Sequence, residues 1–429
     1  MRVLIRTQVL FWLCALAAVI YSQRNLNVAE TTVQREFGFT IEEMAWIHSS
    51  FFWSYALLQV PASWLAHRWG SRIGLSLFCL AGSLSIALTC LTHSVWLWCL
   101  ARLLLGFGQA AALPCIAHVV SQWFTPARRA GATGAVAASM QVGAMIAAYA
   151  TGPLLSHFTL VQYFWILAVP GIIWSVGYYY WFRDDPLAYT ALTPAERDEL
   201  PDQPATVPHT GSGPVSSGKH FSWKFIVASP VLWLICGQQF CRAAGYAFFG
   251  TWFPRFLQET RQMDVKGSGT ATACMYVGVL FGSLFGGMIS DVILRYTGSI
   301  RWARKGVAVS SLALCGLCIG ASYFIRSSEV AIFLMTVGAF CSGVGGPAAY
   351  SVTIDVSGKH VVTIFGVMNT VGNLGAAVFA QFLPNLLLQS SQGKWDLVIG
   401  VFGTLYLLAS ICWIFVDPNA KVFPSENAS

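Results

Sequence analysis

Twelve long apolar runs constrain this chain more than any other feature of its sequence. A helix that crosses a lipid bilayer needs ~20 consecutive, mostly apolar residues, and each run approaches or exceeds that length. We therefore expect an all-α membrane protein with 12 transmembrane helices. The runs cover residues 8–29, 43–66, 73–93, 95–123, 130–155, 160–182, 226–258, 269–293, 304–325, 329–353, 361–388 and 396–416.

The amino-acid composition excludes the soluble classes of protein. Hydrophobic residues make up 56% of the 429 residues and charged residues only 10%, whereas a soluble domain carries ~25% charged residues. The net charge of +7 comes from basic residues in short loops and not from one basic stripe, so nucleic acid is not an expected partner. The 12 cysteines all lie within apolar runs, where we interpret them as small buried hydrophobic residues.

One polar stretch, residues 183–223, divides the runs into two sets of six. We expect an N-terminal six-helix bundle at 1–182, a linker at 183–223 with a short surface helix at Thr193–Leu200, and a C-terminal bundle with a short tail at 224–429. Two equal hydrophobic halves are typical of secondary transporters. Lys and Arg are more frequent in the loops on the linker side, which predicts a cytoplasmic linker and cytoplasmic termini. The compact loops favour a bacterial inner membrane.

Several motifs resemble those of one transporter family. The stretch Trp46–Pro61 is very similar to the second span of the vesicular glutamate transporters, and Phe240-Cys-Arg242 resembles the start of their seventh span. The other motifs are Trp252-Phe-Pro254, Gly287-x-x-Ser-Asp291, and Arg102 with Gly106 and a polar residue at 109. Over residues 20–416 the chain thus resembles the major facilitator superfamily, and within it the anion:cation symporter family. The resemblance implies a monomer with two rocking bundles, and no cofactor is expected. No enzymatic activity is expected either, because the sequence has no His-Glu-x-x-His motif, no phosphate-binding loop and no pair of aspartates within a span.

Arg242 is the strongest candidate for a contact with substrate. An arginine within a membrane span costs ~2.5–3.5 kcal/mol on insertion scales, so it needs a partner or a function. On a helix, Gln238, Arg242, Tyr246 and Phe249 share one face, and the guanidinium fork matches a carboxylate. The resemblance implies the same anion clamp, with Gln239 beside it. The alternative is an arginine bound to helix carbonyls or reaching the surface.

Arg24 lies late in the first run, with Tyr21 three residues before it. The resemblance places an arginine here, but the neighbouring motif aligns that arginine with Gln23, one residue away. One residue turns a side chain by ~100° on a helix, so Arg24 either replaces the family residue or faces elsewhere. His48 and Tyr55 lie seven residues apart and share a face. His48 either contacts ligand or handles protons, or it packs against a neighbouring helix.

Coupling to protons is the point where this sequence departs from the family. Arg102 and Gln109 share a face of the fourth run, and the family carries a glutamate at the second position. An amide cannot take up a proton at biological pH. The resemblance then implies that coupling has moved, to His48 or Glu30, or that the protein exchanges or exports anions.

The other candidate residues lie on the eleventh run and in the loops. Asn369 and Asn373 share one face and either contact substrate or clasp a neighbouring helix. The resemblance implies that loop residues bridge the bundles. The predicted substrate site comprises Arg242, Arg24, His48, Tyr55, Tyr246, Tyr21, Gln109, Gln239, Asn369 and Asn373. The predicted coupling and gating residues are Arg102, His48, Glu30, Arg68, Arg72, Asp291 and Arg295.

These residues favour a transporter of a small organic anion, such as a sugar acid or another carboxylate. Protons, sodium and a counter-anion all stay open as the driving partner. An efflux pump for another small molecule and a non-transporting anion sensor are the alternatives. A cation exporter should bury carboxylates, and this chain buries arginines instead. No metal site is expected, because no zinc-binding motif is present.

Overall fold

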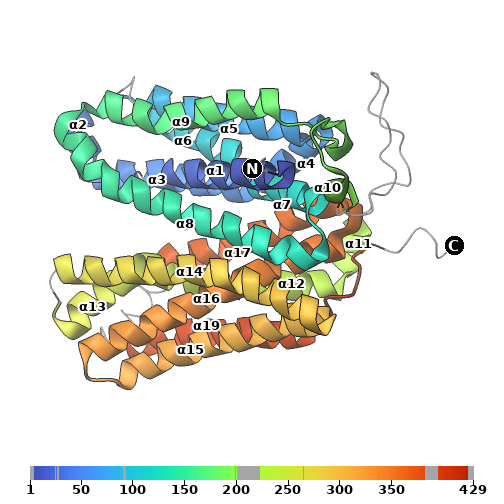
Figure 1. The fold of residues 1–429 in the computed structure, drawn as a ribbon. Helices are drawn as coiled ribbons and strands as arrows, with labels where there is room; N and C mark the ends of the chain where they lie inside the picture. Colours follow the sequence, from blue (N-terminus) through green and yellow to red (C-terminus); the bar gives the residue numbers. More distant parts are fainter. Residues whose placement is uncertain are drawn as a thin grey trace.

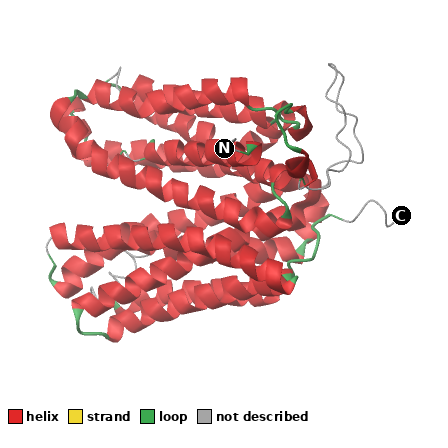
Figure 2. Ribbon diagram, viewed as in Figure 1, coloured by secondary structure: helices red, strands yellow, loops and turns green. Residues whose placement is uncertain are grey.

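The computed structural model describes residues 4–24, 26, 29–89, 93–198, 200, 223–263, 265–381 and 395–423. In this part of the chain every regular element is helical (Figure 2). The first half contains α1 (Ile5–Ser22), α2 (Glu30–Phe37), α3 (Ile41–Leu57), α4 (Gln59–Trp69), α5 (Ser71–Thr89), α6 (Val95–Ala110), α7 (Ala112–Trp123), α8 (Pro126–His157) and α9 (Leu160–Trp181).

The second half follows a polar linker that carries η1 (Pro186–Ala188) and α10 (Pro194–Asp198). It contains α11 (Trp223–Ala228), α12 (Pro230–Ala247), η2 (Phe248–Trp252), α13 (Phe253–Arg261), α14 (Val265–Thr297), η3 (Arg301–Gly306), α15 (Val307–Phe324), α16 (Ser328–Ser357), η4 (Gly358–His360), α17 (Val361–Gln381) and α19 (Asp396–Phe415).

Ten helices in the described residues are long and apolar enough to cross a membrane. The other two predicted spans are interrupted, and each interruption has a proline beside it. Leu58 separates α3 from α4, three residues before Pro61, and the π-helical turn η2 precedes Pro254. Proline has no N–H to continue the hydrogen-bond ladder, so a helix kinks or widens there. The protein is a multi-pass membrane protein, with a 12-helix fold in two halves.

The two halves meet along a small number of helices. α8 packs against α14 and α16, and α17 packs against α4 and α7. In Figure 1 the halves approach each other at the end that carries α10 and the C-terminal segment, and they diverge toward α2 and α13. We call these the linker end and the far end.

The linker docks on the first half through a short capped helix. Thr193 caps α10 by accepting from the backbone N–H of Glu196, and Glu196 accepts from the backbone N–H of Arg6. A capping box of this type satisfies helix-terminal donors that otherwise lack partners. The expected surface helix at Thr193–Leu200 is thus present as α10, whereas residues 201–222 lie outside the described part of the chain.

Candidate functional site

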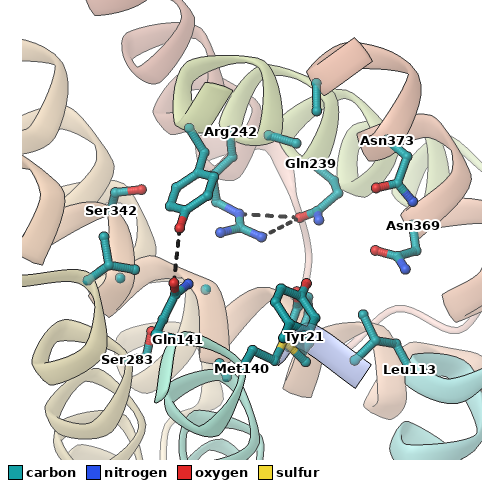
Figure 3. Close-up of a pocket in the computed structure, with 18 of the residues that line it drawn as sticks. Tyr21, Leu113, Met140, Gln141, Gln239, Arg242, Ser283, Ser342, Asn369 and Asn373 are labelled. Atoms are coloured by element: carbon teal, nitrogen blue, oxygen red, sulfur yellow. Dashed lines mark hydrogen bonds between the residues drawn. The ribbon is translucent and has the colours of Figure 1, made fainter. Parts of the chain in front are cut away.

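A cavity with a volume of ≈ 170 Å³ lies between the two halves. Aromatic and polar side chains from both halves line it (Figure 3). A concave site with a few convergent polar groups is the usual form of a small-molecule site. The lining residues that carry polar groups are Tyr21, Tyr55, Gln141, Gln239, Arg242, Tyr246, Ser283, Ser342, Tyr350, Asn369 and Asn373.

Arg242 extends from α12 into this cavity. Its Nε and Nη2 atoms donate to Oε1 of Gln239, at 3.3 and 3.1 Å. Its guanidinium carbon lies 5.9 Å from the centre of the Tyr350 ring. The neighbouring Gln239 orients the guanidinium through an uncharged oxygen, so the positive charge stays available to a ligand.

Two members of the predicted stripe, Gln238 and Phe249, do not face the cavity. Gln239, Arg242 and Tyr246 line the cavity. Gln238 is fully buried and accepts from Nε1 of Trp413 at 3.2 Å, so it faces α19. Phe249 is also buried, against Tyr406. On a helix, residues at i and i+3 share a face with each other, as do residues at i and i+4, so either Gln239 or Gln238 could lie on the face of Arg242. The packing of α12 against α19 buries Gln238 and leaves Gln239 at the cavity.

Tyr246 connects the two halves across the cavity. Its hydroxyl donates to Oε1 of Gln141 on α8 at 3.2 Å (Figure 3). Sequence reasoning missed Gln141, although an amide in the middle of a predicted span is a signal for a cavity or a helix contact. It also missed Tyr350, whose ring lies beside Arg242.

Arg24 lies behind the tyrosines that line the first half of the cavity. Its guanidinium carbon is 4.2 Å from the Tyr21 ring centre and 4.5 Å from the Tyr55 ring centre. Its Nε donates to Oε1 of Gln109 at 2.8 Å, and Gln109 donates to the carbonyl of Ile20. The charge is therefore held between two aromatic faces and a neutral amide.

Gln23, the other candidate for this position, points away from the cavity. Its Nε2 donates to Oγ of Ser83 on α5 at 2.9 Å and to the carbonyl of Leu167 on α9 at 3.2 Å. Of the two neighbours, it is Arg24 that lies beside Gln109, Tyr21 and Tyr55.

Asn369 and Asn373 line the cavity from α17. Asn373 donates through Nδ2 to Oε1 of Gln59 on α4 at 3.2 Å, so it joins the two halves. The Nδ2 atom of Asn369 is buried and has no hydrogen-bond partner among the described residues.

Of the predicted substrate residues, Arg24, Gln109 and His48 are not among the described residues that line the cavity. Arg102 is buried on α6, within electrostatic range of Tyr163 on α9. His48 lies on α3, two turns before Tyr55. Glu30 begins α2 at the far end, and its side chain lies outside the described part of the structure.

Charged residues close the linker end between the two halves. Asp291 on α14 accepts from the backbone N–H groups of Ala130 and Gly131, at the start of α8, and from Arg304 at 2.8 Å. Arg304 also donates to the carbonyl of Pro126 at 2.5 Å. A carboxylate near a helix N-terminus is stabilised by the positive end of the helix dipole.

A second ion pair across the halves joins Arg129 on α8 to Asp355 on α16. Sequence reasoning missed Arg129, Asp355 and Arg304 as bridging residues. All three lie at helix ends, where the one-dimensional pattern does not distinguish a buried ion pair from a solvated loop charge.

The other predicted gating residues do not bridge the halves. Arg72 donates to the carbonyl of Tyr179 at 2.7 Å, and its backbone N–H donates to Asp184 at the start of the linker. Neither contact reaches the second half. Arg68 is exposed beside Trp64 of its own helix, and Arg295 is exposed at the linker end of α14. Of the four, only Asp291 makes the predicted contact between bundles.

Comparison with known proteins identifies the family to which this architecture belongs. A sequence model of the Major Facilitator Superfamily matches residues 12–300 and 235–429. The structure is similar to that of the proton:xylose symporter XylE, with a TM-score of 0.74, 10% sequence identity, and coverage of 96% of this chain and 97% of that one. At this identity the likeness concerns the fold alone.

Two curated relatives cover almost the whole chain. The probable sulfoacetate transporter SauU of Cupriavidus necator is 25% identical over 433 residues, which cover 100% of this chain and 97% of the relative. The probable galactarate/D-glucarate transporter GarP of Escherichia coli is 27% identical over 436 residues, covering 97% and 95%. The predicted family resemblance is confirmed: the chain belongs to the major facilitator superfamily.

Proposed function

We propose that this protein is a secondary transporter of a small organic anion with carboxylate or sulfonate groups. The observation that supports this most directly is Arg242, whose charge faces a cavity between the two halves beside Gln239 and Tyr350. The names of the two relatives supply the substrate classes to test, sulfoacetate and sugar diacids. Arg24, Tyr21, Tyr55, Tyr246 and the two asparagines complete the binding site.

Transport proceeds by rocking of the two halves about the cavity. The linker and both termini lie in the cytoplasm of a bacterium, and the protein resides in the inner membrane. With the linker end closed by the Asp291 and Arg129 contacts, the structure corresponds to the outward-facing half of the cycle. The usual carboxylates for proton coupling are replaced, with Gln109 beside Arg24.

The energy source for transport should differ from that of a simple proton symporter. Moving an anion into a negative-inside cell costs ~2.3 kcal/mol per charge per 100 mV. A neutral Gln109 cannot bring in a compensating proton. The anion therefore moves by exchange, by export, or with a cation bound elsewhere.

Uptake of labelled sulfoacetate and galactarate into proteoliposomes preloaded with the same unlabelled anion tests this function. We expect saturable uptake that Arg242→Ala reduces by roughly 10- to 150-fold, because a hydrogen bond to a charged group contributes about 1.5–3 kcal/mol. Arg242→Lys should retain part of the activity, since it keeps the charge but loses the fork. Arg326→Ala, which removes an exposed arginine outside the cavity, is the matched control.

Other outcomes would contradict the proposal in distinct ways. Saturable binding of the anion in detergent without any flux would identify a sensor. Flux of organic cations, without flux of any anion, would identify an efflux pump. Wild-type uptake in Arg242→Ala would remove the arginine from the binding site.

A further inference from the structure

Two arginines are each held by a glutamine, one in each half: Arg242 lines the cavity, and Arg24 lies behind the lining residues Tyr21 and Tyr55. Arg24 donates to Oε1 of Gln109 at 2.8 Å, and Arg242 donates to Oε1 of Gln239 at 3.1 Å. A glutamine oxygen fixes the direction of a guanidinium without neutralising it. The centre of the protein therefore carries two positive charges with neutral partners.

Among the described residues, no carboxylate lines the cavity to neutralise these two charges. The sequence contains none between residues 44 and 183 or between 203 and 258, so α4 to α9 and α12 have none to contribute. The two glutamates of α3, Glu42 and Glu43, lie in its first turn, about 3.5 helical turns before Tyr55. Asp291 and Asp355 are already paired with Arg304 and Arg129 at the linker end.

Two buried donors near the cavity also lack acceptors. Nη2 of Arg24, on the first half, and Nδ2 of Asn369, on the second half, have no hydrogen-bond partner among the described residues. A buried donor without an acceptor destabilises the protein. An anion that spans the cavity would supply acceptors to both halves at once.

From this arrangement we propose that the protein is an obligate exchanger of small dianions, an inference that rests on the transport function proposed above. Closing both ends around an empty cavity would bury two like charges in a medium of low dielectric constant, which is strongly unfavourable. A bound dianion neutralises both. Only the loaded protein therefore changes conformation readily, and each anion that enters is matched by one that leaves.

The same charges select the substrate class. A chain of a few carbons with an ionised carboxylate or sulfonate at each end pairs with Arg24 and Arg242 together. A monoanion such as galactonate leaves one guanidinium without a counter-charge. Exchange of dianion for dianion also moves no net charge, so the membrane potential does not oppose it.

The decisive measurement compares two kinds of proteoliposome, one preloaded with unlabelled galactarate and one without internal anion. The potential is clamped at zero with potassium and valinomycin. We expect labelled galactarate to enter preloaded liposomes at least about tenfold faster, the factor that corresponds to a 1.4 kcal/mol difference in barrier. Preloading with galactonate should stimulate uptake much less. Equal rates with and without internal dianion would overturn the exchange mechanism.

Gln109→Glu tests the charge argument directly. A carboxylate 2.8 Å from Nε of Arg24 would form an internal ion pair in the empty protein, so net uptake into liposomes without internal anion should rise about tenfold. Gln109→Met removes the same hydrogen bond without adding charge and should leave net uptake low. If Gln109→Glu loses exchange as well, Gln239→Glu makes the same test in the second half.

The outcomes distinguish this inference from the proposed function. Absence of uptake even in preloaded liposomes would refute anion transport itself. Uptake that is equally fast without internal anion leaves anion transport standing and refutes exchange. Exchange-competent glutamate variants whose net uptake stays at the wild-type level would refute the role of the uncompensated arginines.

Discussion

Gly287→Val is expected to abolish transport and to leave the protein with its linker end open. A Cβ atom at Gly287 would lie 2.2 Å from the carbonyl oxygen of Ala130 and 3.1 Å from Cα of Gly131. The obstacle is backbone on both counts, so the neighbouring side chains cannot relieve it. α8 and α14 could then no longer approach each other, and we expect transport to fall by about 100-fold or more.

Spin labels on opposite halves report this change. Arg68 and Arg295 are exposed at the linker end of α4 and α14, and both can be labelled as cysteines in a protein without its 12 native cysteines. Gly287→Val should shift the label-to-label distances to longer values. Gly400→Val is the matched control, because a Cβ atom at Gly400 on α19 meets no atom within 4 Å. Unchanged distances in Gly287→Val would show that the α8–α14 contact does not close the linker end.

Asp291→Asn is expected to destabilise the same closed state by about 3–5 kcal/mol, the effect of removing one partner from a buried ion pair. The side chain of Arg304 is 0% exposed and pairs with Asp291 at 2.8 Å. Asp291 also accepts from the N–H groups of Ala130 and Gly131. An amide offers one acceptor oxygen where the carboxylate offers two, and it leaves the guanidinium without a counter-charge.

A double-mutant cycle with Arg304→Met separates charge from packing. We expect Asp291→Asn to shift the spin-label distances toward the open linker end and to lower the unfolding temperature. The double variant should recover part of both effects, because the unpaired charge is gone. If the two substitutions are simply additive, the ion pair does not contribute to closure.

The positions of the helices followed from the sequence, because each apolar run must satisfy its own backbone in lipid and only a helix does so. The expected span at 8–29 nevertheless ends as a helix at Ser22. Beyond it the backbone turns, with the N–H of Leu26 donating to the carbonyl of Arg24. Counting residues on a helical wheel therefore could not decide between Gln23 and Arg24, since the wheel no longer applies there.

For the contacts that bridge the two halves, too, the sequence indicated some of the residues but not their partners. Asp291 was expected at the interface from its motif, yet its partners are the start of α8 and Arg304. Arg72, which has the same kind of position in the first half, instead binds Tyr179 of its own half and Asp184 of the linker. Charges at helix ends can reach several neighbours, and only the packing of the helices selects one of them.

The sequence by itself determined that this protein is a helical membrane protein in two halves with arginines and few acids near its centre, because bilayer thickness and the cost of buried charge act on composition and local pattern alone. The tertiary structure decided which side chains share the cavity. Arg242 meets Gln239 through its own helix, but Arg24 meets Gln109 across 85 residues of chain. Such a contact depends on the relative rotation of two packed helices, and no periodicity within either helix encodes that rotation.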